Sequence, residues 1–453
     1  MKTHRAVVIL ALVVMTVATL AAPLLAAGPP ATPTPDEAPH GIANQAAEAQ
    51  TAKTTASGET GPVAVPEPSE KALRHARSGD WLWLTSELWA LLVPGVILFT
   101  GFSSKLRDVA RRIGRNWFFT IIVYFALFVL ITFIIGLPLS YCTGFARPHA
   151  YGLSNQTFGK WFGDELKGVM VGLIMGGLLV WIPYQLVKKS PRRWWLWTSL
   201  LAIPLTAFFL LIAPVVIDPL FNKFGPMKDK VLEQKILDLA GRAGIEGARV
   251  FEVDKSTDTN TVNAYVTGFG GSKRIVLWDT TIAKLAPDQL LFVMAHEMGH
   301  YVLGHVVKSI FFAAAMILFT LYAAYRLQAG LIARFSNRFG FTQLSDIASL
   351  PLVMLLVGVL SFVVTPVANG YSRWQEHESD RFGLEITRNN HAAATAFVTL
   401  QEENLGIPRR GLLYKLWRAS HPLLGERIDF CNSYRPWDEG KPGRYEQLFK
   451  KTP

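Results

Sequence analysis

Residues 295–325 read "AHEMGHYVLGHVVKSIFFAAAMILFTLYAAY", a cluster of histidines that runs directly into a long apolar stretch. His296 and His300 are four residues apart, so on a helix both imidazoles project from one face, as two ligands of one zinc ion require. Glu297 lies one step around the helix, where a carboxylate can take a proton from metal-activated water. The stretch therefore predicts a catalytic zinc helix at the edge of a bilayer. The alternatives are a helix with satisfied polar residues and a structural metal site.

The third histidine does not complete the zinc site by spacing. Zinc peptidases that use a third histidine have the pattern HExxHxxGxxH, whereas here Gly304 comes one residue late and His305 one residue early. On a continuous helix His305 would also lie about 140° from His300. We therefore expect His305 to be a polar residue that caps the following span at the membrane interface.

The third zinc ligand is then expected to be a carboxylate from elsewhere in the chain. Residues 370–387, "GYSRWQEHESDRFGLEIT", are predicted to form a helix in which Glu376 and Asp380 share one face. One could bind zinc while the other hydrogen-bonds a liganding histidine, and spacing alone does not rank them. The alternative is a solvated acidic face balanced by Arg373 and Arg381.

Long apolar runs dominate the rest of the chain. Half of the 453 residues are hydrophobic and only 17% are charged, and a run of about 20 apolar residues can cross a hydrocarbon core of about 30 Å. We predict a polytopic α-helical membrane protein of six to seven spans, with a zincin-like α+β metallopeptidase unit at the membrane face. The six internal candidate spans are 82–103, 117–141, 166–187, 194–217, 306–329 and 347–369.

The remaining segments complete the expected domain organisation. Residues 1–27 have the pattern of a signal peptide or a first span, and residues 28–80 that of a flexible Pro/Ala-rich linker. The last two spans would form a hairpin that returns the chain to the face it left. The expected order after the linker is four spans (81–217), the zinc-peptidase unit with the HEMGH helix (218–305), two spans (306–369) and the C-terminal part of the catalytic unit (370–453).

The net charge of +11 is distributed over short loops and not over one surface. The loops 105–116, 188–193 and 333–339 are basic, which marks the cytoplasmic side of a membrane protein. The catalytic half would then lie on the non-cytoplasmic side of a bacterial inner membrane. No basic and aromatic pattern suggests nucleic acid as a partner. Two cysteines, Cys142 and Cys431, are too few for a disulfide framework or a cysteine-ligated zinc site.

Five segments together resemble the type I CAAX prenyl protease family of integral-membrane zinc endopeptidases. They cover roughly residues 140 to 430 and extend well beyond HEMGH. The segments are "GLSNQTFGKWFGDELKG" (152–168), "APVVIDPLFNKF" (213–224), "NAYVTGFGGSKRIVLWDT" (263–280), "SRWQEHESDRFG" (372–383) and "SHPLLGERI" (420–428).

The resemblance assigns roles that spacing leaves open. It implies that Glu376 is the third ligand of one Zn²⁺ per chain and that Asp380 is the carboxylate behind a ligand. It implies that His421 binds the substrate or the transition state, and that Asn263 lies on a substrate-facing strand. Arg427 could orient His421 or the substrate, or form a surface salt bridge.

The expected function is hydrolysis of peptide bonds in membrane-associated or misfolded proteins by metal-activated water. The signal-like N-terminus and the loop charges depart from the eukaryotic family pattern, which favours this broad substrate class over a dedicated prenyl-protein protease. A third hypothesis is a non-catalytic transporter or scaffold with a structural zinc site. Its spans should contain charged residues, and the six candidate spans contain almost none.

Overall fold

The computed structural model describes residues 61–267 and 274–450. The predicted signal peptide or first span, and most of the predicted linker, lie outside these residues. Within them, six helical segments are long and apolar enough to cross a membrane, which confirms a polytopic α-helical protein. They are built from α4 (Glu70–Phe99), α6 (Trp117–Tyr141), α8 (Phe158–Leu179) followed by α9 (Trp181–Lys189), α10 (Trp194–Ile212), α14 (His305–Phe339) and α15 (Leu350–Thr387).

Short helices connect and extend these segments. The membrane half contains α5 (Phe102–Gly114), the π-helix η2 (Cys142–Ala146), α7 (Arg147–Ala150), the π-helix η3 (Ala213–Ile217), and the 3₁₀ turns η4 (Asp218–Leu220) and η6 (Ile347–Ser349). The remaining helices belong to the catalytic unit: α11 (Lys230–Arg242), α12 (Asp279–Lys284), α13 (Pro287–Val302), α16 (Asn390–Glu403), α17 (Leu412–Trp417), α18 (Leu424–Ser433), and the 3₁₀ turns η7 (Pro436–Glu439) and η8 (Glu446–Leu448).

Two elements differ from the sequence expectations. Helix α15 runs unbroken through 38 residues, so the last span and the predicted helix 370–387 are one element. Helix α4 begins at Glu70, inside the predicted linker. The residues before it lie against the catalytic unit, where the backbone of Val63 exchanges two hydrogen bonds with the Asn432 amide at 2.9 and 2.8 Å.

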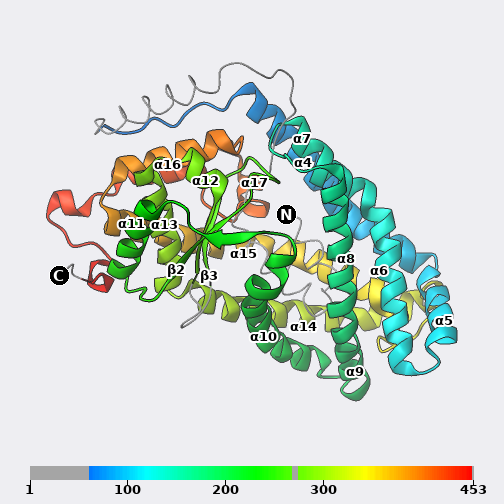
Figure 1. Ribbon diagram of the computed structural model, residues 1–453. Coiled ribbons are helices and arrows are strands. Elements are labelled where there is room, and N and C mark those ends of the chain that lie inside the picture. The colour runs from blue at the N-terminus through cyan, green and yellow to red at the C-terminus, as the bar shows by residue number, and fades with distance from the viewer. Residues whose placement is uncertain (1–60, 268–273, 451–453) are drawn as a thin grey trace.

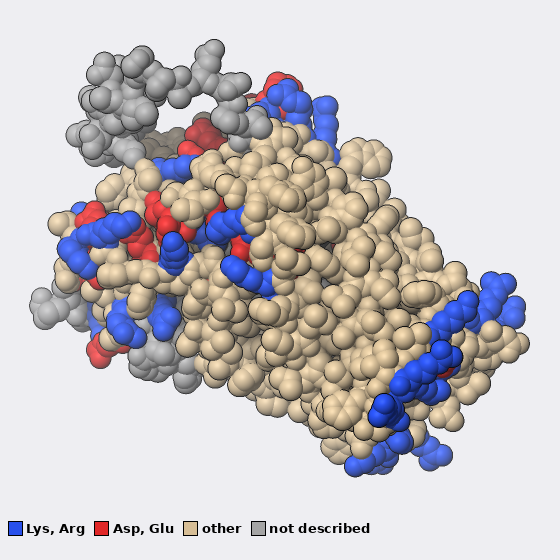
Figure 2. All heavy atoms as spheres, turned by 45° about the vertical axis from the view of Figure 1, so that its right-hand side comes forward, with Lys and Arg blue, Asp and Glu red and all other residues tan. Residues whose placement is uncertain are grey.

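The molecule has an elongated, helical membrane half and a mixed unit at one end (Figure 1). The long helices α14 and α15 pack side by side as the expected hairpin and reach from the mixed unit into the membrane half. A band without Lys, Arg, Asp or Glu crosses the visible face, between a mixed-charge end and a basic end (Figure 2). Large apolar side chains on α4, α6, α8, α10, α14 and α15 are exposed, which is the surface that lipid requires.

The catalytic unit contains a four-stranded sheet in the order β1-β2-β4-β3. Its strands are β1 (Phe224–Pro226), β2 (Arg249–Val253), β3 (Ala264–Thr267) and β4 (Arg274–Trp278). The central β2 and β4 are parallel, with Phe251 opposite Val276, and the outer strands are antiparallel to them. Strand β3 is therefore an edge strand of the described sheet, and it packs beside α13.

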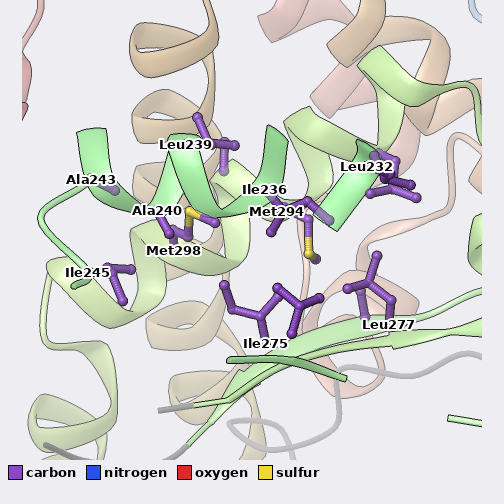
Figure 3. Packing of buried hydrophobic residues seen from close by; sticks show 14 of the residues in the cluster. Leu232, Ile236, Leu239, Ala240, Ala243, Ile245, Ile275, Leu277, Met294 and Met298 are labelled. Atoms are coloured by element: carbon purple, nitrogen blue, oxygen red, sulfur yellow. The ribbon is translucent and has the colours of Figure 1, made fainter. Parts of the chain in front are cut away.

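The core of this unit fixes the orientation of α13. Leu232 and Ile236 of α11, Ile275 of β4, and Met294 and Met298 of α13 converge in one buried cluster (Figure 3). Because residues two apart on a helix point in roughly opposite directions, packing Met294 and Met298 against the sheet turns His296 and His300 away from it. The opposite face of α13 is covered by α15.

The loop between α7 and α8 joins the two halves of the molecule. Ser154 and Thr259 form an isolated antiparallel bridge, and Asn155 donates its backbone N–H to Asp258 at 3.2 Å. Lys160 at the start of α8 pairs with Asp258 at 2.6 Å. These contacts attach the edge of the catalytic unit to the end of a span.

Candidate metal centre

Helices α13 and α15 approach each other closely at two glycines. A Cβ on Gly299 would lie 3.1 Å from Cβ of Phe382, and one on Gly383 would lie 3.3 Å from the backbone nitrogen of His296. Side chains at these positions would separate the helices, since contacts this short are rare between real Cβ atoms. The glycines therefore let α13 present its histidines directly to α15. Neither glycine could be predicted as a contact residue, because the sequence around a glycine in a helix does not show which element packs against it.

Three side chains converge at this contact and could hold a metal ion: His296, His300 and Glu376. The two Nε2 atoms lie 3.2 Å apart. Glu376 places Oε2 3.2 Å from Nε2 of His296 and Oε1 3.3 Å from Nε2 of His300. His296 and Glu376 are buried, and His300 is partly buried.

The protonation pattern of this cluster fits a cation. His296 Nδ1 lies 2.9 Å from Asp380 Oδ1, and an ionised carboxylate can only accept, so Nδ1 carries a proton; in the neutral imidazole, the form that binds a metal, Nε2 then offers a lone pair. The buried Oε2 of Glu376 has no hydrogen-bond partner among the described residues. With neutral imidazoles, the cluster therefore directs nitrogen and oxygen lone pairs at one another, which is the donor set that a bound metal ion requires.

Asp380 and Arg427 form a brace behind His296. Arg427 Nε donates to Asp380 Oδ2 at 2.9 Å, and its Nη2 donates to Oδ1 at 2.5 Å. Asp380 is 1% exposed and Arg427 is 8% exposed, and the guanidinium lies 4.1 Å from the ring centroid of Phe397. Arg427 is therefore not part of a surface salt bridge, and its predicted role toward His421 or the substrate stays a prediction.

His421 reaches the cluster from the loop between α17 and α18. Its Nε2 lies 3.3 Å from Glu376 Oε1, and its Nδ1 lies 2.9 Å from the Ser420 hydroxyl. Burial lowers the pKa of the His421 imidazole, against the opposing effect of Glu376. The loop is held by Arg373, whose Nη1 donates to the carbonyls of Lys415 and Ala419 at 2.6 and 2.7 Å. Arg373 thus holds the loop that carries His421, and it does not neutralise a solvated acidic helix face, which was the alternative for Glu376 and Asp380.

Glu297 lies beside the cluster on the same helix turn. It is half-buried, and burial raises the pKa of its carboxyl while the neighbouring His296 and His300 lower it. A carboxyl with a raised pKa is a stronger base once ionised. Its position supports the proton-transfer role that the motif predicted, which stays a prediction.

Asn263 precedes the edge strand β3. Its backbone N–H donates to Thr281 Oγ1 at 2.7 Å, and its side-chain Oδ1 accepts from the N–H of Ala264 at 2.9 Å. Asn263 thus lies directly before the edge strand that packs beside α13, whereas the other predicted site residues meet around Glu376. Its substrate-facing role stays a prediction.

His305 differs from its expectation. Gly304, with φ +65°, separates α13 from α14, so the two helices are not continuous. His305 is 3% exposed, and its Nδ1 lies 3.0 Å from Nδ1 of His300. It begins the span, as expected, but its ring turns inward beside the cluster and not toward the membrane interface.

A solved structure with the same fold is that of S. mikatae Ste24p. It matches with a TM-score of 0.70 over 86% of this chain and 96% of that chain, at 24% identity. At this identity the likeness concerns the fold alone. A helical membrane half, joined to a small α+β unit with a buried His–His–Glu cluster, defines the class of membrane-embedded metallopeptidases.

Family descriptions and relatives specify this class further. "Peptidase family M48" matches residues 226–434, and "CAAX prenyl protease N-terminal, five membrane helices" matches residues 60–223. The metalloprotease YhfN of Bacillus subtilis is 37% identical over 81% of this chain and 86% of its own length. A CAAX prenyl protease 1 homolog of Arabidopsis thaliana is 31% identical over 80% and 87%. The chain therefore belongs to peptidase family M48 and is an integral-membrane, metal-dependent endopeptidase.

Proposed function

We propose that the metal is zinc, with one ion per chain held by His296, His300 and Glu376. The observation that carries this proposal is that one ligand atom from each of these three side chains lies within 4.8 Å of the others. Zinc takes nitrogen and oxygen ligands at about 2.0–2.1 Å in a tetrahedron with edges of about 3.3 Å, and the two Nε2 atoms lie 3.2 Å apart. Three protein ligands with a fourth position left for water are typical of a catalytic zinc site.

The surrounding residues supply the proton transfers of peptide hydrolysis. When bound, zinc supplies Lewis-acid activation of water and of the scissile carbonyl. Glu297 takes the proton from the attacking water and returns it to the leaving amine. His421, whose Nδ1 faces the Ser420 hydroxyl, directs Nε2–H toward the cluster, where it can donate to the developing oxyanion. Asp380 and Arg427 hold His296 in the tautomer that leaves Nε2 free.

The edge strand offers a place for an extended substrate. A peptide can add to β3 by main-chain hydrogen bonds, because β3 is at the edge of the described sheet and lies beside α13. Asn263, at the start of β3, would then contact the peptide near the metal.

The substrates we propose are membrane-associated or misfolded proteins, cleaved on the non-cytoplasmic side of a bacterial inner membrane. The likeness to a metalloprotease of Bacillus subtilis supports the bacterial setting, and the basic end opposite the catalytic unit supports the orientation (Figure 2). A prenylated CAAX protein is the second candidate. It is favoured by relatives such as the CAAX prenyl protease 1 of Saccharomyces cerevisiae, 30% identical over 65% of this chain and 68% of that protein.

Glu297→Gln tests the proposed chemistry. Purified wild type and variant should both contain about one zinc per chain, because Glu297 is not a proposed ligand. Cleavage of an unfolded protein by the variant should fall by at least the 10²–10⁴-fold that general-base catalysis contributes. Metal analysis and a fluorogenic peptide assay measure the two quantities. Cleavage by Glu297→Gln at the wild-type rate would refute the proposal.

The two substrate classes separate in the same assay. A farnesylated peptide and its unprenylated counterpart are compared with an unfolded soluble protein, using the Glu297→Gln variant to subtract contaminating proteases. Equal rates on both peptides support the broad substrate class. A requirement for the farnesyl group supports the prenyl-protein alternative.

A further inference from the structure

We propose that His305 positions His300 for the metal by accepting its Nδ1 proton. This inference rests on the proposed zinc site, and it assigns a role to the histidine that the motif spacing excluded as a ligand. His305 Nδ1 and His300 Nδ1 lie 3.0 Å apart, a hydrogen-bond distance between two ring nitrogens. One must donate and the other accept, so the pair defines the tautomers of both rings.

The metal cluster decides which ring donates. His300 directs Nε2 at Nε2 of His296 and at Glu376 Oε1, so Nε2 must offer a lone pair. A neutral His300 then carries its proton on Nδ1 and donates it to Nδ1 of His305. His305 in turn holds its own proton on Nε2. The Ser379 hydroxyl, 3.4 Å from the same Nδ1, can donate a second, longer bond to it.

The break between α13 and α14 makes this contact possible. Gly304 adopts the left-handed region, with φ +65° and ψ 30°, and α14 restarts at His305. The turn carries the ring back toward His300, from which a continuous helix would direct it about 140° away. The backbone at His305 is also held by α15, since Gln375 donates to the His305 carbonyl at 3.3 Å and accepts from Ser309 at 3.1 Å.

The two proposed histidine ligands consequently have different hydrogen-bond acceptors behind them. His296 is backed by a buried carboxylate, Asp380, whose charge Arg427 neutralises. His300 is backed by a neutral ring. Groups behind a liganding histidine set its tautomer and orientation, and their loss usually costs 10–100-fold in metal affinity. His305 is therefore a positioning residue, acting through His300 without touching the metal.

The test compares two substitutions at His305, of which one removes the hydrogen-bond acceptor and the other keeps one. His305→Leu removes the acceptor, whereas His305→Gln keeps one in its Oε1 atom. Zinc affinity is measured by chelator competition on purified protein in detergent. His305→Leu should weaken zinc binding by roughly 10–100-fold, and His305→Gln should recover most of that loss. His75→Leu is the matched control, because His75 is 5% exposed in α4 and lies outside the cluster.

Two further measurements separate positioning from general damage. Thermal unfolding of the metal-free proteins should be similar for His305→Leu and His75→Leu. The visible spectrum of the cobalt-loaded protein should change in His305→Leu and return toward wild type in His305→Gln. Unchanged zinc affinity in His305→Leu, or an equal loss in both His305 variants, would overturn the inference. Absence of zinc binding by the wild type would instead overturn the proposed function.

Discussion

Arg427 shows how much one buried charge can matter to a metal site. Its guanidinium makes a bidentate contact with Asp380, and both groups are almost fully buried. Such a pair is weak evidence for net stability, yet removing one partner leaves the other charge buried without compensation. Arg427 thus permits an ionised Asp380 behind His296.

Arg427→Met is expected to destabilise the protein by about 3–5 kcal/mol, the usual result of breaking a buried ion pair. It should also weaken zinc binding, because Asp380 would no longer be held as the acceptor for His296. Denaturant unfolding in detergent and chelator competition measure the two effects.

An exposed ion pair provides the control for this substitution. Arg409 and Asp429 pair at 2.8 Å with side chains that are 59% and 53% exposed, so Arg409→Met should change stability by no more than about 1 kcal/mol. Equal effects of the two substitutions would contradict the role given to Arg427.

Spacing on one helix could predict His296, His300 and Glu297, because the periodicity of a helix is local. It could not separate Glu376 from Asp380, since both share a face, and the resemblance to a family supplied that assignment. The structure places Glu376 beside both histidines. The predicted direction of the His305 ring is wrong for a physical reason: it holds only for a continuous helix, and Gly304 interrupts the helix.

At the scale of elements, the contact between α13 and α15 determines whether the cluster can form. Gly299→Val would place atoms within about 3.1–3.2 Å of Phe382, and overpacking of this kind typically costs 1–3 kcal/mol. We expect lower thermal stability together with weaker zinc binding, because the separated helices would pull Glu376 away from His300.

Gly241→Val is the matched control for this prediction. Gly241 lies in α11, where an added Cβ would meet nothing within 4 Å, and valine has a higher helix propensity than glycine. Its stability and zinc affinity should be at least those of the wild type. A Gly299→Val protein with normal zinc affinity would show that the close helix contact is dispensable.

Hydropathy was sufficient to locate the spans, but it did not show that the last span and the predicted helix 370–387 form one element. The composition becomes polar just beyond Gly370. Helix α15 nevertheless continues to Thr387. A helix flanked by lipid must satisfy its own backbone hydrogen bonds, so local helix breakers have less influence there than in water.

At the scale of the molecule, charge is segregated between the two ends. Figure 2 shows Lys and Arg concentrated at the end opposite the catalytic unit, beyond the uncharged band. The basic loops near α5 and α9 belong to this end (Figure 1). By the positive-inside rule, this is the end that we propose faces the cytoplasm.

Cysteine labelling tests this orientation. In a Cys142→Ser background, with the buried Cys431 retained, Lys441→Cys places a thiol at a side chain that is 70% exposed on the catalytic end. A membrane-impermeant maleimide should label it in intact spheroplasts. Arg192→Cys, in an exposed basic loop, should react only after permeabilisation. The opposite pattern would invert the proposed topology.

The order of the strands in the sheet and of the helices in the membrane half could not be predicted from the sequence. Strand-like segments were recognisable, but the order β1-β2-β4-β3 depends on contacts distant in sequence. Helix order around the membrane half has the same origin, because lipid-facing and helix-facing apolar residues look alike in composition.

The unbroken helix α15 fixes the distance between its first residue and the metal cluster. From Leu350 at its start to Glu376 the helix takes 26 residue steps, which rise about 39 Å at 1.5 Å per residue. The hydrocarbon core is about 30 Å thick, so with Leu350 at one edge of the core Glu376 would lie about 9 Å beyond the other, and closer if the helix tilts. An extended chain covers that distance in about three residues. Cleavage sites should therefore be specified by their height above the bilayer as much as by the side chains around them.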